Sequence, residues 1–455
     1  MDIFFEIECL TERSKAFLGE EIRKNYLKNS QKRDVGNLIL KLIQYNKENL
    51  HFLGVESITE GSDDKVSVYF KSGQYIGAVP IISSSTGLPV ADFLVTPRYV
   101  KSKDFTTITD IIQKIKHDLV IEYKKDSILK SNKILEPPLF LEAIKFVNAL
   151  RQLVTQNWNK FRQVTRLLNE PAGNVDWDDY ARNEYKVERR LKFLCRKNEL
   201  SSFHPEYCQI KYVYELCKKE LLSTNTPLKV RLNVSNDLQF IDKKLEFIPP
   251  MRVSAMVTRV SDPPIVKQCK EIANRILQNK FVSSLAWRVN LSELYERYIQ
   301  YIFKLVSQRY GGKVINNSQL REVGQAPVGW KLKHLSPDII YETRDETIMI
   351  DAKYKSHLYN TDSSTDSLKE EHRHDLHQIL AYSSFTKFPE SNQKTAFLCY
   401  PSSEPYHFKL KYNSLQRDFI NRVILLGVPF DLGQSAKVVD EILMIIKSLP
   451  SEKAA

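Results

Sequence analysis

The sequence lacks the patterns that mark zinc sites, small disulfide scaffolds and P-loop motors. Its six cysteines are scattered over 455 residues without a Cys-x-x-Cys pair, which fits neither a zinc site nor a disulfide framework and favours a reducing, cytoplasmic location. Residues 324–331 have two glycines at P-loop spacing but lack the Lys-Ser/Thr pair that a P-loop requires. The chain therefore cannot power translocation by a P-loop mechanism.

Long apolar runs are also missing. No run approaches the ~20 residues that a membrane-spanning helix needs. The first ten residues carry three acids and no basic segment, so we expect neither a secretory signal nor a membrane partner. Positive charge is abundant, because 67 Lys and Arg against 55 Asp and Glu leave a formal net charge of +12. This excess favours a polyanionic partner such as DNA, although many basic proteins bind no nucleic acid.

The chain is long enough for two or three domains, each with its own core. We predict an α/β multi-domain protein, with a β-rich N-terminal domain at 1–135, a mainly helical middle region at 136–285 and a C-terminal α/β domain at 286–455. In the first domain, two runs flanking a Lys-Ser-Gly-Gln turn indicate a hairpin over 66–82. In the middle region, helical periodicity covers 139–168, about 180–222 and about 265–280.

One predicted hairpin carries the most informative residues. The β-branched runs 339–341 and 347–350 flank a polar turn at 343–346. Opposed residues in an antiparallel hairpin have a constant index sum, which places Asp338 opposite Asp351, with their Cβ atoms ~5 Å apart. Side chains alternate along a strand, so Lys353 shares the face of Asp351. Two carboxylates and an ammonium converge there, an arrangement that can hold Mg²⁺ and activate water for phosphodiester hydrolysis.

Two alternatives weaken this interpretation. The hairpin could lie at the surface with its charges merely solvated, although the apolar run before Asp351 is typical of a central strand. A three-residue loop would shift the register by one and turn Asp338 to the other face.

The order of elements around this hairpin is also informative. A helix over 291–306 stops at Gly311-Gly312, a strand follows at 313–317, and after the hairpin come a helix at 372–386 and a strand at 394–400. Helix–strand–strand–strand–helix–strand is the order of the PD-(D/E)xK restriction-endonuclease-like core. The residues Pro337-Asp338 and Asp351-Ala352-Lys353 match the motif of that class.

The chain resembles McrC, the nuclease subunit of McrBC-type restriction systems. Ile350-Asp-Ala-Lys-Tyr-Lys355 is the most specific element of this resemblance, and the Gln378-x-x-x-Tyr382 pattern behind it is similar to RecB-like nucleases. The other elements are weak individually but follow in the expected order: residues 173–177, 294–296, 400–401 and 428–433.

The resemblance implies roles for five of these positions. Asp338 and Asp351 would bind Mg²⁺, for which Mn²⁺ would substitute, and Lys353 would orient the attacking water or steady the phosphate charge. Gln378 and Tyr382 lie one helical turn apart and would face the DNA backbone. The alternative for Tyr382 is a half-buried core aromatic.

Glu296 and Glu293 are candidates for a further metal carboxylate on the helix that precedes the hairpin. Only one of them can face the site, and Glu296 matches the family position better. The alternative is a solvated helix face.

Basic residues crowd the segment at 186–197, which the periodicity predicts to be helical. We expect phosphate contacts there, the alternative being an ordinary charged face. The DNA-binding candidates are Lys186, Arg189, Arg190 and Lys192. Four histidines, at 357, 372, 374 and 377, have no His-Glu-x-x-His pattern or cysteine partner, so they do not favour a structural zinc site.

The family resemblance also implies a partner, a separate McrB-like AAA+ GTPase motor. By analogy, residues 1–135 would engage this motor and stimulate GTP hydrolysis. The resulting prediction is a Mg²⁺-dependent DNA endonuclease subunit of a multi-subunit McrBC-like restriction system. Its rivals are a stand-alone repair or phage-type nuclease with the same core and a non-catalytic scaffold that bridges a motor to DNA.

Overall fold

The structure is a computed structural model of the whole chain. It describes residues 5–26, 35–61, 65–98, 105–115, 119–130, 138–156, 158–201, 203–224, 226–279, 285–317, 320–321, 334–344, 347–359, 366–384, 393–413 and 420–448. The chain divides into two compact units, one formed by 1–137 with 283–455 and one by 138–282. The first unit therefore joins segments from both ends of the sequence. The three-part division expected from the sequence stays a prediction.

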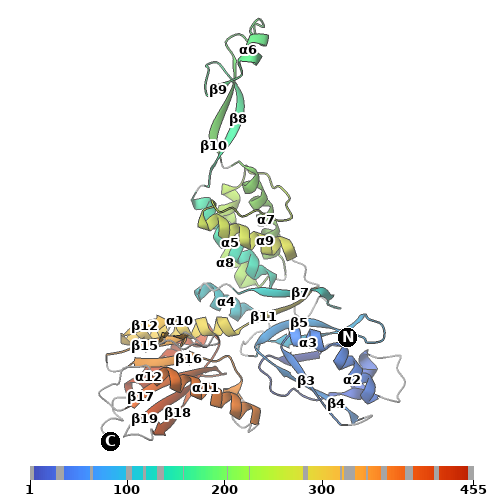
Figure 1. Cartoon of the computed structure of the whole chain (residues 1–455), viewed down its shortest axis with the longest axis vertical. Helices are drawn as coiled ribbons and strands as arrows, with labels where there is room; N and C mark the ends of the chain where they lie inside the picture. Colours follow the sequence, from blue (N-terminus) through green and yellow to red (C-terminus); the bar gives the residue numbers. More distant parts are fainter. Residues whose placement is uncertain are drawn as a thin grey trace, which may run out of the picture. The chain divides into compact units, whose positions relative to one another are not determined.

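The first unit contains two sheets built mainly from its N-terminal segment, with one strand of the larger sheet added from residues 285–290 (Figure 1). The strands of the larger sheet, in spatial order, are β1 (Phe5–Glu8), β6 (Pro89–Thr96), β5 (Tyr75–Ile82), β11 (Leu285–Asn290) and β7 (Ile121–Ile128). The smaller sheet has the order β2 (Phe17–Leu18), β4 (Ser67–Ser72) and β3 (Val55–Glu60). The accompanying helices are α1 (Gly19–Tyr26), α2 (Val35–Tyr45), α3 (Lys47–Phe52) and α4 (Thr106–Ile115).

The hairpin predicted over 66–82 is wrong. Both strands exist, but β4 pairs with β2 and β3, whereas β5 pairs with β6 and β11. The turn between them passes the chain from one sheet to the other. Gly77 in β5 allows β11 to approach closely. Its φ is +152°, and a Cβ at this position would lie 2.1 Å from the carbonyl oxygen of Trp287 in β11.

The C-terminal segment forms a six-stranded sheet. Its spatial order is β12 (Lys313–Asn316), β15 (Ile339–Glu342), β16 (Thr347–Ala352), β17 (Gln393–Pro401), β19 (Ile420–Val428) and β18 (Tyr406–Asn413). The strands β16, β17 and β19 are parallel, and the other pairs are antiparallel. Between β12 and β15, two-residue strands pair at β13 (Leu320–Arg321) and β14 (His334–Leu335).

Helices cover both faces of this sheet. On one face Phe303 of α10 (Ser292–Tyr310) packs on Tyr341 and Phe397, and α12 (Ser435–Ser448) lies against α10. On the other face Ile379 and Tyr382 of α11 (Asp366–Ser384) share a core with residues of the central strands. Short 3₁₀ turns lie at η2 (His357–Tyr359) and η3 (Leu432–Gln434). The element order α10, β12, β15, β16, α11, β17 agrees with the order that the sequence predicts.

Helix α10 ends where its glycines predict. Gly311 and Gly312 have φ values of +90° and +88°, which β-carbon-bearing residues rarely adopt. A Cβ on Gly312 would also lie 2.5 Å from the carbonyl oxygen of Glu342. The close turn lets β12 return beside β15, the first strand of the hairpin.

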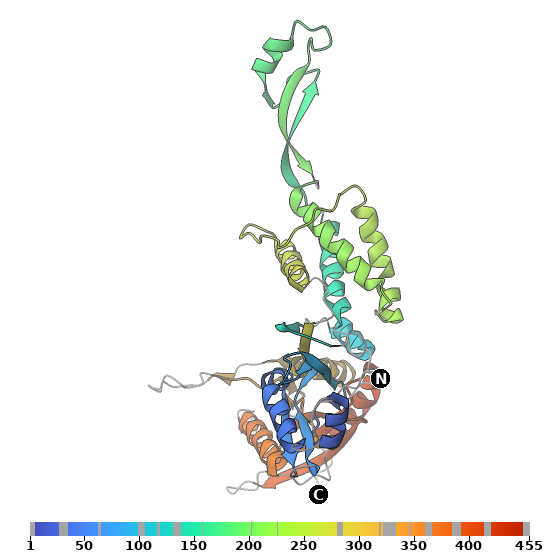
Figure 2. The ribbon, with the colours of Figure 1, turned by 90° about the vertical axis from the view of Figure 1, so that its right-hand side faces the viewer.

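The second unit consists of a helical bundle and a long hairpin. In the bundle, α5 (Leu139–Thr155) packs against α7 (Pro205–Leu221), α8 (Leu228–Lys244) and α9 (Pro264–Asn279). The hairpin, here called the arm (residues 160–201), contains β8 (Lys160–Leu168), β9 (Asn174–Val175), α6 (Trp177–Asn183) and β10 (Phe193–Ser201). Figure 2 shows its two long strands as one twisted ribbon.

The prediction of continuous helix over 139–168 and 180–222 is therefore wrong in part. Residues 160–168 and 193–201 are paired strands, and residues 184–192 form turns at the tip of the arm. From Cys195 onward β10 alternates more buried and more exposed residues, which is the two-residue period of a strand and not the period of a helix. Among the helices that the structure describes, none is both long and apolar enough to cross a bilayer. The mixed α/β organisation in several parts agrees with the predicted fold class.

Candidate active site

The hairpin β15–β16 brings Asp338 and Asp351 together as the index sum predicts. Ile339 pairs with Ile350 and Glu342 with Thr347, which confirms the register and excludes a three-residue loop. Asp338 immediately precedes β15, and its Oδ2 accepts a hydrogen bond of 2.8 Å from the backbone N–H of Ala352. The side chain of Asp351 is only 2% exposed, so the alternative of a solvated surface hairpin is wrong.

Lys353 lies where β16 ends and is held from several sides. Its backbone N–H donates to the carbonyl of Cys399 at 2.8 Å, which aligns it with the end of β17. Its Nζ lies 2.8 Å from Asp351 Oδ2 and donates to Gln378 Oε1 at 2.9 Å. Gln378 Nε2 in turn donates to the Tyr382 hydroxyl at 2.7 Å. The structure thus joins four of the predicted residues into one chain of interactions.

Tyr382 is a core aromatic, as its alternative interpretation expected, and its role at the DNA backbone stays a prediction. Its ring belongs to the core between α11 and the sheet, and only 5% of the residue is exposed. Its hydroxyl nevertheless holds Gln378, which orients the amide that contacts Lys353. Tyr382 therefore acts on the site through Gln378 in this structure.

The carboxylates carry more negative charge than their surroundings balance. Burial, then the neighbouring carboxylates of Asp351 and Glu296, raise the pKa of Asp338 to about 8. Burial opposes the charge on Lys353, but the carboxylates of Asp351, Asp375 and Asp338 together outweigh burial, and the pKa of Lys353 is raised. Two acids that repel each other beside a single close ammonium have an electrostatic reason to take up a cation.

The residues present fit a magnesium ion. Mg²⁺ is commonly bound by one or two carboxylates together with waters and substrate phosphates. Asp338 and Asp351 supply the two carboxylates, and Asp351 Oδ2 is buried and accepts no well-aligned hydrogen bond. Within the described parts of the chain, no group of three or more His, Cys, Asp or Glu side chains has metal-site geometry. Two protein carboxylates suit a partly hydrated Mg²⁺.

Glu296 lies near this pair, at the first turns of α10. Its Oε1 accepts hydrogen bonds from Asn317 Nδ2 at 2.8 Å and Gln300 Nε2 at 3.1 Å. Asn317, at φ +45°, donates its backbone N–H to the carbonyl of Asp338 at 2.8 Å. This network fixes Glu296 close enough to affect the pKa of Asp338. Glu293 is exposed, as expected if only one of the two acids faces the site.

Sequence reasoning missed Asp375. It is 3% exposed and holds Lys355 Nζ through Oδ1 at 2.8 Å, while Oδ2 accepts a hydrogen bond from the Tyr400 hydroxyl at 2.9 Å. Helical spacing could have revealed it, because Asp375 stands one turn before Gln378 on the same face of α11.

Two of the four histidines pack beside Asp375. The His357 ring stacks on Tyr400 at 5.0 Å, and the His372 ring lies 5.8 Å from the His357 ring. Burial lowers the pKa of His357 to about 4, so His357 is neutral at pH 7. His374 and His377 are exposed on α11.

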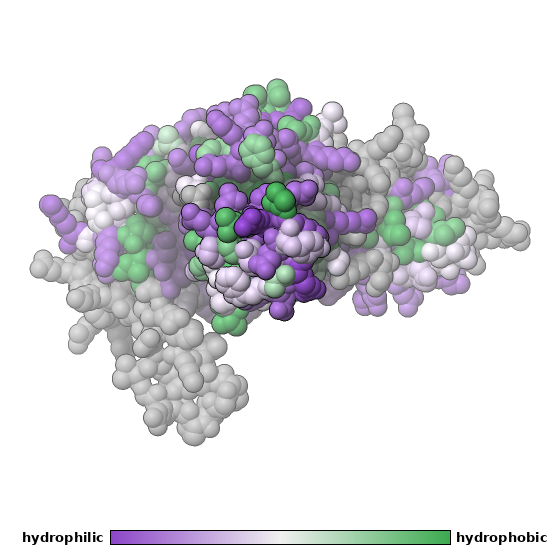
Figure 3. Space-filling view, turned by 90° about the horizontal axis from the view of Figure 1, so that it is seen from above, coloured by the Kyte–Doolittle hydropathy of each residue, from purple (hydrophilic) through white to green (hydrophobic). Residues whose placement is uncertain are grey.

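The basic candidates lie in the other unit, at the tip of the arm rather than on a helix. Lys186, Arg190 and Lys192 are exposed, and Arg189 is partly exposed with Asp179 at 3.9 Å. Large apolar side chains are exposed beside them, including Val187 (90%) and Tyr185 (75%). In Figure 3, hydrophilic and hydrophobic residues are mixed on the face seen from above.

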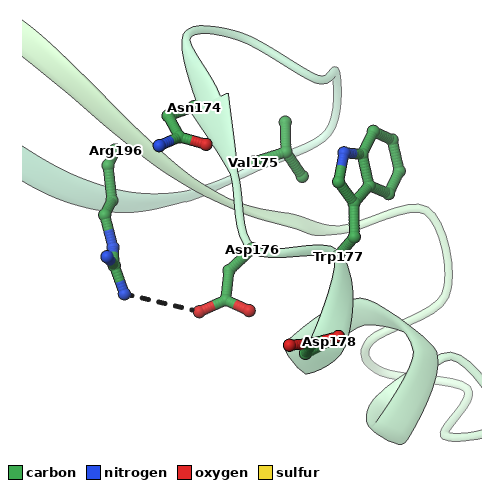
Figure 4. A pocket seen from close by; sticks show the side chains of 6 residues that line it. All are labelled: Asn174, Val175, Asp176, Trp177, Asp178 and Arg196. Carbon is green, nitrogen blue, oxygen red and sulfur yellow. Dashed lines mark hydrogen bonds and ion pairs between the residues drawn. The ribbon is translucent and has the colours of Figure 1, made fainter.

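A pocket of about 410 Å³ lies on the arm, lined by residues 174–178 and Arg196 (Figure 4). Four of its residues belong to the segment Gly173-Asn-Val-Asp-Trp177. Gly173 has φ +68°, and a Cβ there would meet the carbonyl of Arg196 at 2.7 Å. Asp176 caps α6 by accepting from the N–H of Asp179 and pairs with Arg196 at 3.5 Å. These interactions indicate a structural role for the segment, which forms the bend between β9 and α6.

Comparisons with known proteins agree with the sequence resemblance. A family profile described as "McrBC 5-methylcytosine restriction system component" matches residues 71–401. No curated protein matches the chain. Among solved structures, a half-complex of Thermococcus gammatolerans McrB AAA+ hexamers with bound McrC is similar, at a TM-score of 0.45 and 13% identity, covering 97% of this chain and 100% of that chain. A second, the McrBC complex of the same organism, gives 0.29 and 13%, covering 67% and 88%.

Proposed function

The chain belongs to the family of McrBC 5-methylcytosine restriction system components, and from this membership we propose that it is the McrC-type nuclease subunit of such a system. It is a Mg²⁺-dependent DNA endonuclease with a PD-(D/E)xK core, and it hydrolyses phosphodiester bonds. The observation that carries the proposal is the Asp338–Asp351 pair, in which Asp351 is buried, with Lys353 at 2.8 Å from Asp351.

The chemistry follows from the charges at the end of the hairpin. Asp338 and Asp351 would hold Mg²⁺, with Mn²⁺ able to replace it, and Glu296 would support them through solvent. The bound metal would supply Lewis acidity and lower the pKa of an attacking water. Lys353 keeps its charge beside Asp351 and donates an N–H to the water or to the phosphate oxygen on which negative charge develops.

The residues on α11 position that ammonium. Gln378 accepts from Lys353 Nζ and donates to Tyr382, so a fixed amide limits the positions that Nζ can adopt. Orientation of this kind contributes to rate because the donor need not reorganise as the reaction proceeds.

In this proposal, nucleotide hydrolysis and DNA cleavage are carried out by different polypeptides. The sequence has no P-loop, so an AAA+ GTPase of the McrB type would move or remodel the DNA, and residues 1–135 would engage it. Basic residues of the arm, Lys186, Arg189, Arg190 and Lys192, would contact DNA phosphates.

The test is a plasmid cleavage assay with the purified full-length chain, a McrB-type GTPase, GTP and a divalent metal. We expect cleavage with Mg²⁺ or Mn²⁺, binding without cleavage in Ca²⁺, and no cleavage in EDTA. Cleavage in EDTA by a pure sample would contradict the metal mechanism.

Omission of the GTPase separates the proposal from its rivals. Equal cleavage without it would favour a stand-alone nuclease. GTPase stimulation without cleavage under any metal condition would favour a non-catalytic scaffold.

A further inference from the structure

A second lysine stands at the end of β16, two residues beyond Lys353. Lys355 leaves the strand in a tight turn, because its backbone N–H donates to the carbonyl of Lys353 at 2.9 Å. Its Nζ donates to Asp375 Oδ1 at 2.8 Å. Gln378 and Asp375, one turn apart on α11, thus each hold one lysine of the sequence Asp-Ala-Lys-Tyr-Lys.

Lys355 is more accessible than Lys353. The exposed fraction of its side chain is 32%, against 17% for Lys353 and 4% for Asp375. Nζ of Lys353 is engaged by both Asp351 and Gln378, whereas Lys355 has Asp375 as its one acceptor among the described residues. An ammonium has three donors, so Lys355 retains two for a ligand that approaches from solvent.

Asp375 is built to fix this lysine. It is buried, Tyr400 donates a hydrogen bond to its second oxygen, and the nearby His357 is neutral at pH 7. Lys355 is therefore the cation that balances the Asp375 carboxylate. A buried carboxylate anchored by a tyrosine hydroxyl restricts where the lysine head can lie.

We propose that Lys355 binds a DNA phosphate next to the one that is cut, and that Asp375 is the positioning residue that aims it. This inference rests on the proposed nuclease function. Lys355 adds an accessible positive charge to a region where acids outnumber lysines. The competing explanation is a purely structural ion pair between α11 and the end of β16.

A charge-balanced double variant separates the two explanations. Lys355→Gln alone leaves Asp375 buried without its cation and could reduce stability for that reason. Lys355→Gln with Asp375→Asn removes both charges and keeps a hydrogen-bonding pair, so a structural ion pair would be replaced at little cost. Thermal unfolding of each variant checks that the fold is retained.

The readout is binding of a labelled DNA duplex by the full-length chain in Ca²⁺ over a series of NaCl concentrations. We expect the double variant to bind roughly tenfold more weakly and the slope of log Kd against log salt to fall by about one, the value for a single lysine–phosphate ion pair. Asp375→Asn alone keeps Lys355 charged but no longer aims it, so it should retain the slope and bind DNA more weakly than wild type; wild-type affinity in this variant would remove the positioning role of Asp375. The double variant leaves the net charge unchanged, and Lys447→Gln, which removes an exposed lysine of α12, is the charge-matched control for Lys355→Gln alone.

Wild-type affinity and slope in the double variant would overturn the proposal and leave Lys355 a structural counter-charge. The same result in Lys355→Arg as in wild type, together with weaker binding in the double variant, would support it. The binding readout does not require cleavage. Failure of the wild type to cut DNA would therefore refute the nuclease function without deciding the role of Lys355.

Discussion

The arm and the end of the β15–β16 hairpin are both rich in charge, but they hold it differently. At the tip of the arm the charged side chains are exposed and face solvent. At the hairpin, Asp351 is 2% exposed and each charge lies within hydrogen-bonding or ion-pair distance of another residue. Solvent screens the charges at the tip of the arm, whereas burial lets the charges at the hairpin shift one another's pKa values strongly. Exposed charge can supply affinity for a polyanion, and buried charge can supply chemistry.

Among the predicted effects, substitution of Lys353 should give the largest, a loss of DNA cleavage. Lys353→Met removes the ammonium beside Asp351, and we expect at least a ~100-fold loss of single-turnover cleavage, the size expected for removal of one positioned donor. Lys369→Met removes an exposed lysine from α11 and serves as the control. Cleavage within threefold of wild type in Lys353→Met would remove this residue from the site. Asp338→Ala should behave as Lys353→Met does.

Neutralisation of the tip of the arm should weaken binding and leave the chemistry intact. The variant replaces Lys186, Arg189, Arg190 and Lys192 with Gln. We expect the slope of log Kd against log salt to fall by about one for each phosphate that is no longer neutralised, without sequence selectivity. Cleavage at saturating DNA should be unchanged.

The control for this variant replaces four other lysines of the same unit, Lys219, Lys229, Lys243 and Lys244, and so matches its change in net charge. If the slope of log Kd against log salt is equal in the two variants, the tip of the arm is an ordinary solvated face and does not bind DNA phosphates.

A smaller effect should appear in the pH dependence of stability. Asp338 keeps its proton up to about pH 8 when folded but only to about its ordinary pKa of 3.8 when unfolded. The folded state therefore binds more protons in this window, and metal-free stability falls as the pH rises from about 4 to about 8. The difference in Tm between Asp338→Asn and wild type should grow in favour of the variant over that window. A difference independent of pH would contradict the raised pKa.

The sequence predicted the hairpin well because its evidence is local. Turn length and residue types fix the register, and the register alone determines that Asp338 opposes Asp351. The face of α11 was predictable for the same reason, since helical spacing puts Gln378 and Tyr382 together.

The failures in strand pairing concern information that is not local. The turn between β4 and β5 gives no sign that the two strands belong to different sheets. The pairing of β11 with β5 and β7 joins residues roughly 160 to 215 positions apart in the sequence. It also means that removal of residues 1–135 would strip β11 of both partners, so the engagement of a motor is better tested with the full-length chain. The prediction of a helix at 186–197 failed because exposed strands and turns carry polar residues in patterns similar to those of an exposed helix face.

The central claim is that the Asp338–Asp351 pair is a metal-dependent nuclease centre, and Asp351→Asn tests it most directly. The substitution keeps the shape of the side chain but removes an anionic ligand from Mg²⁺. In the complex with the GTPase partner, cleavage and GTP turnover are measured in the same reaction for wild type and variant. The account predicts that the variant stimulates GTP hydrolysis as wild type does and cuts no DNA. DNA cleavage by the variant at a rate within threefold of wild type would contradict the account.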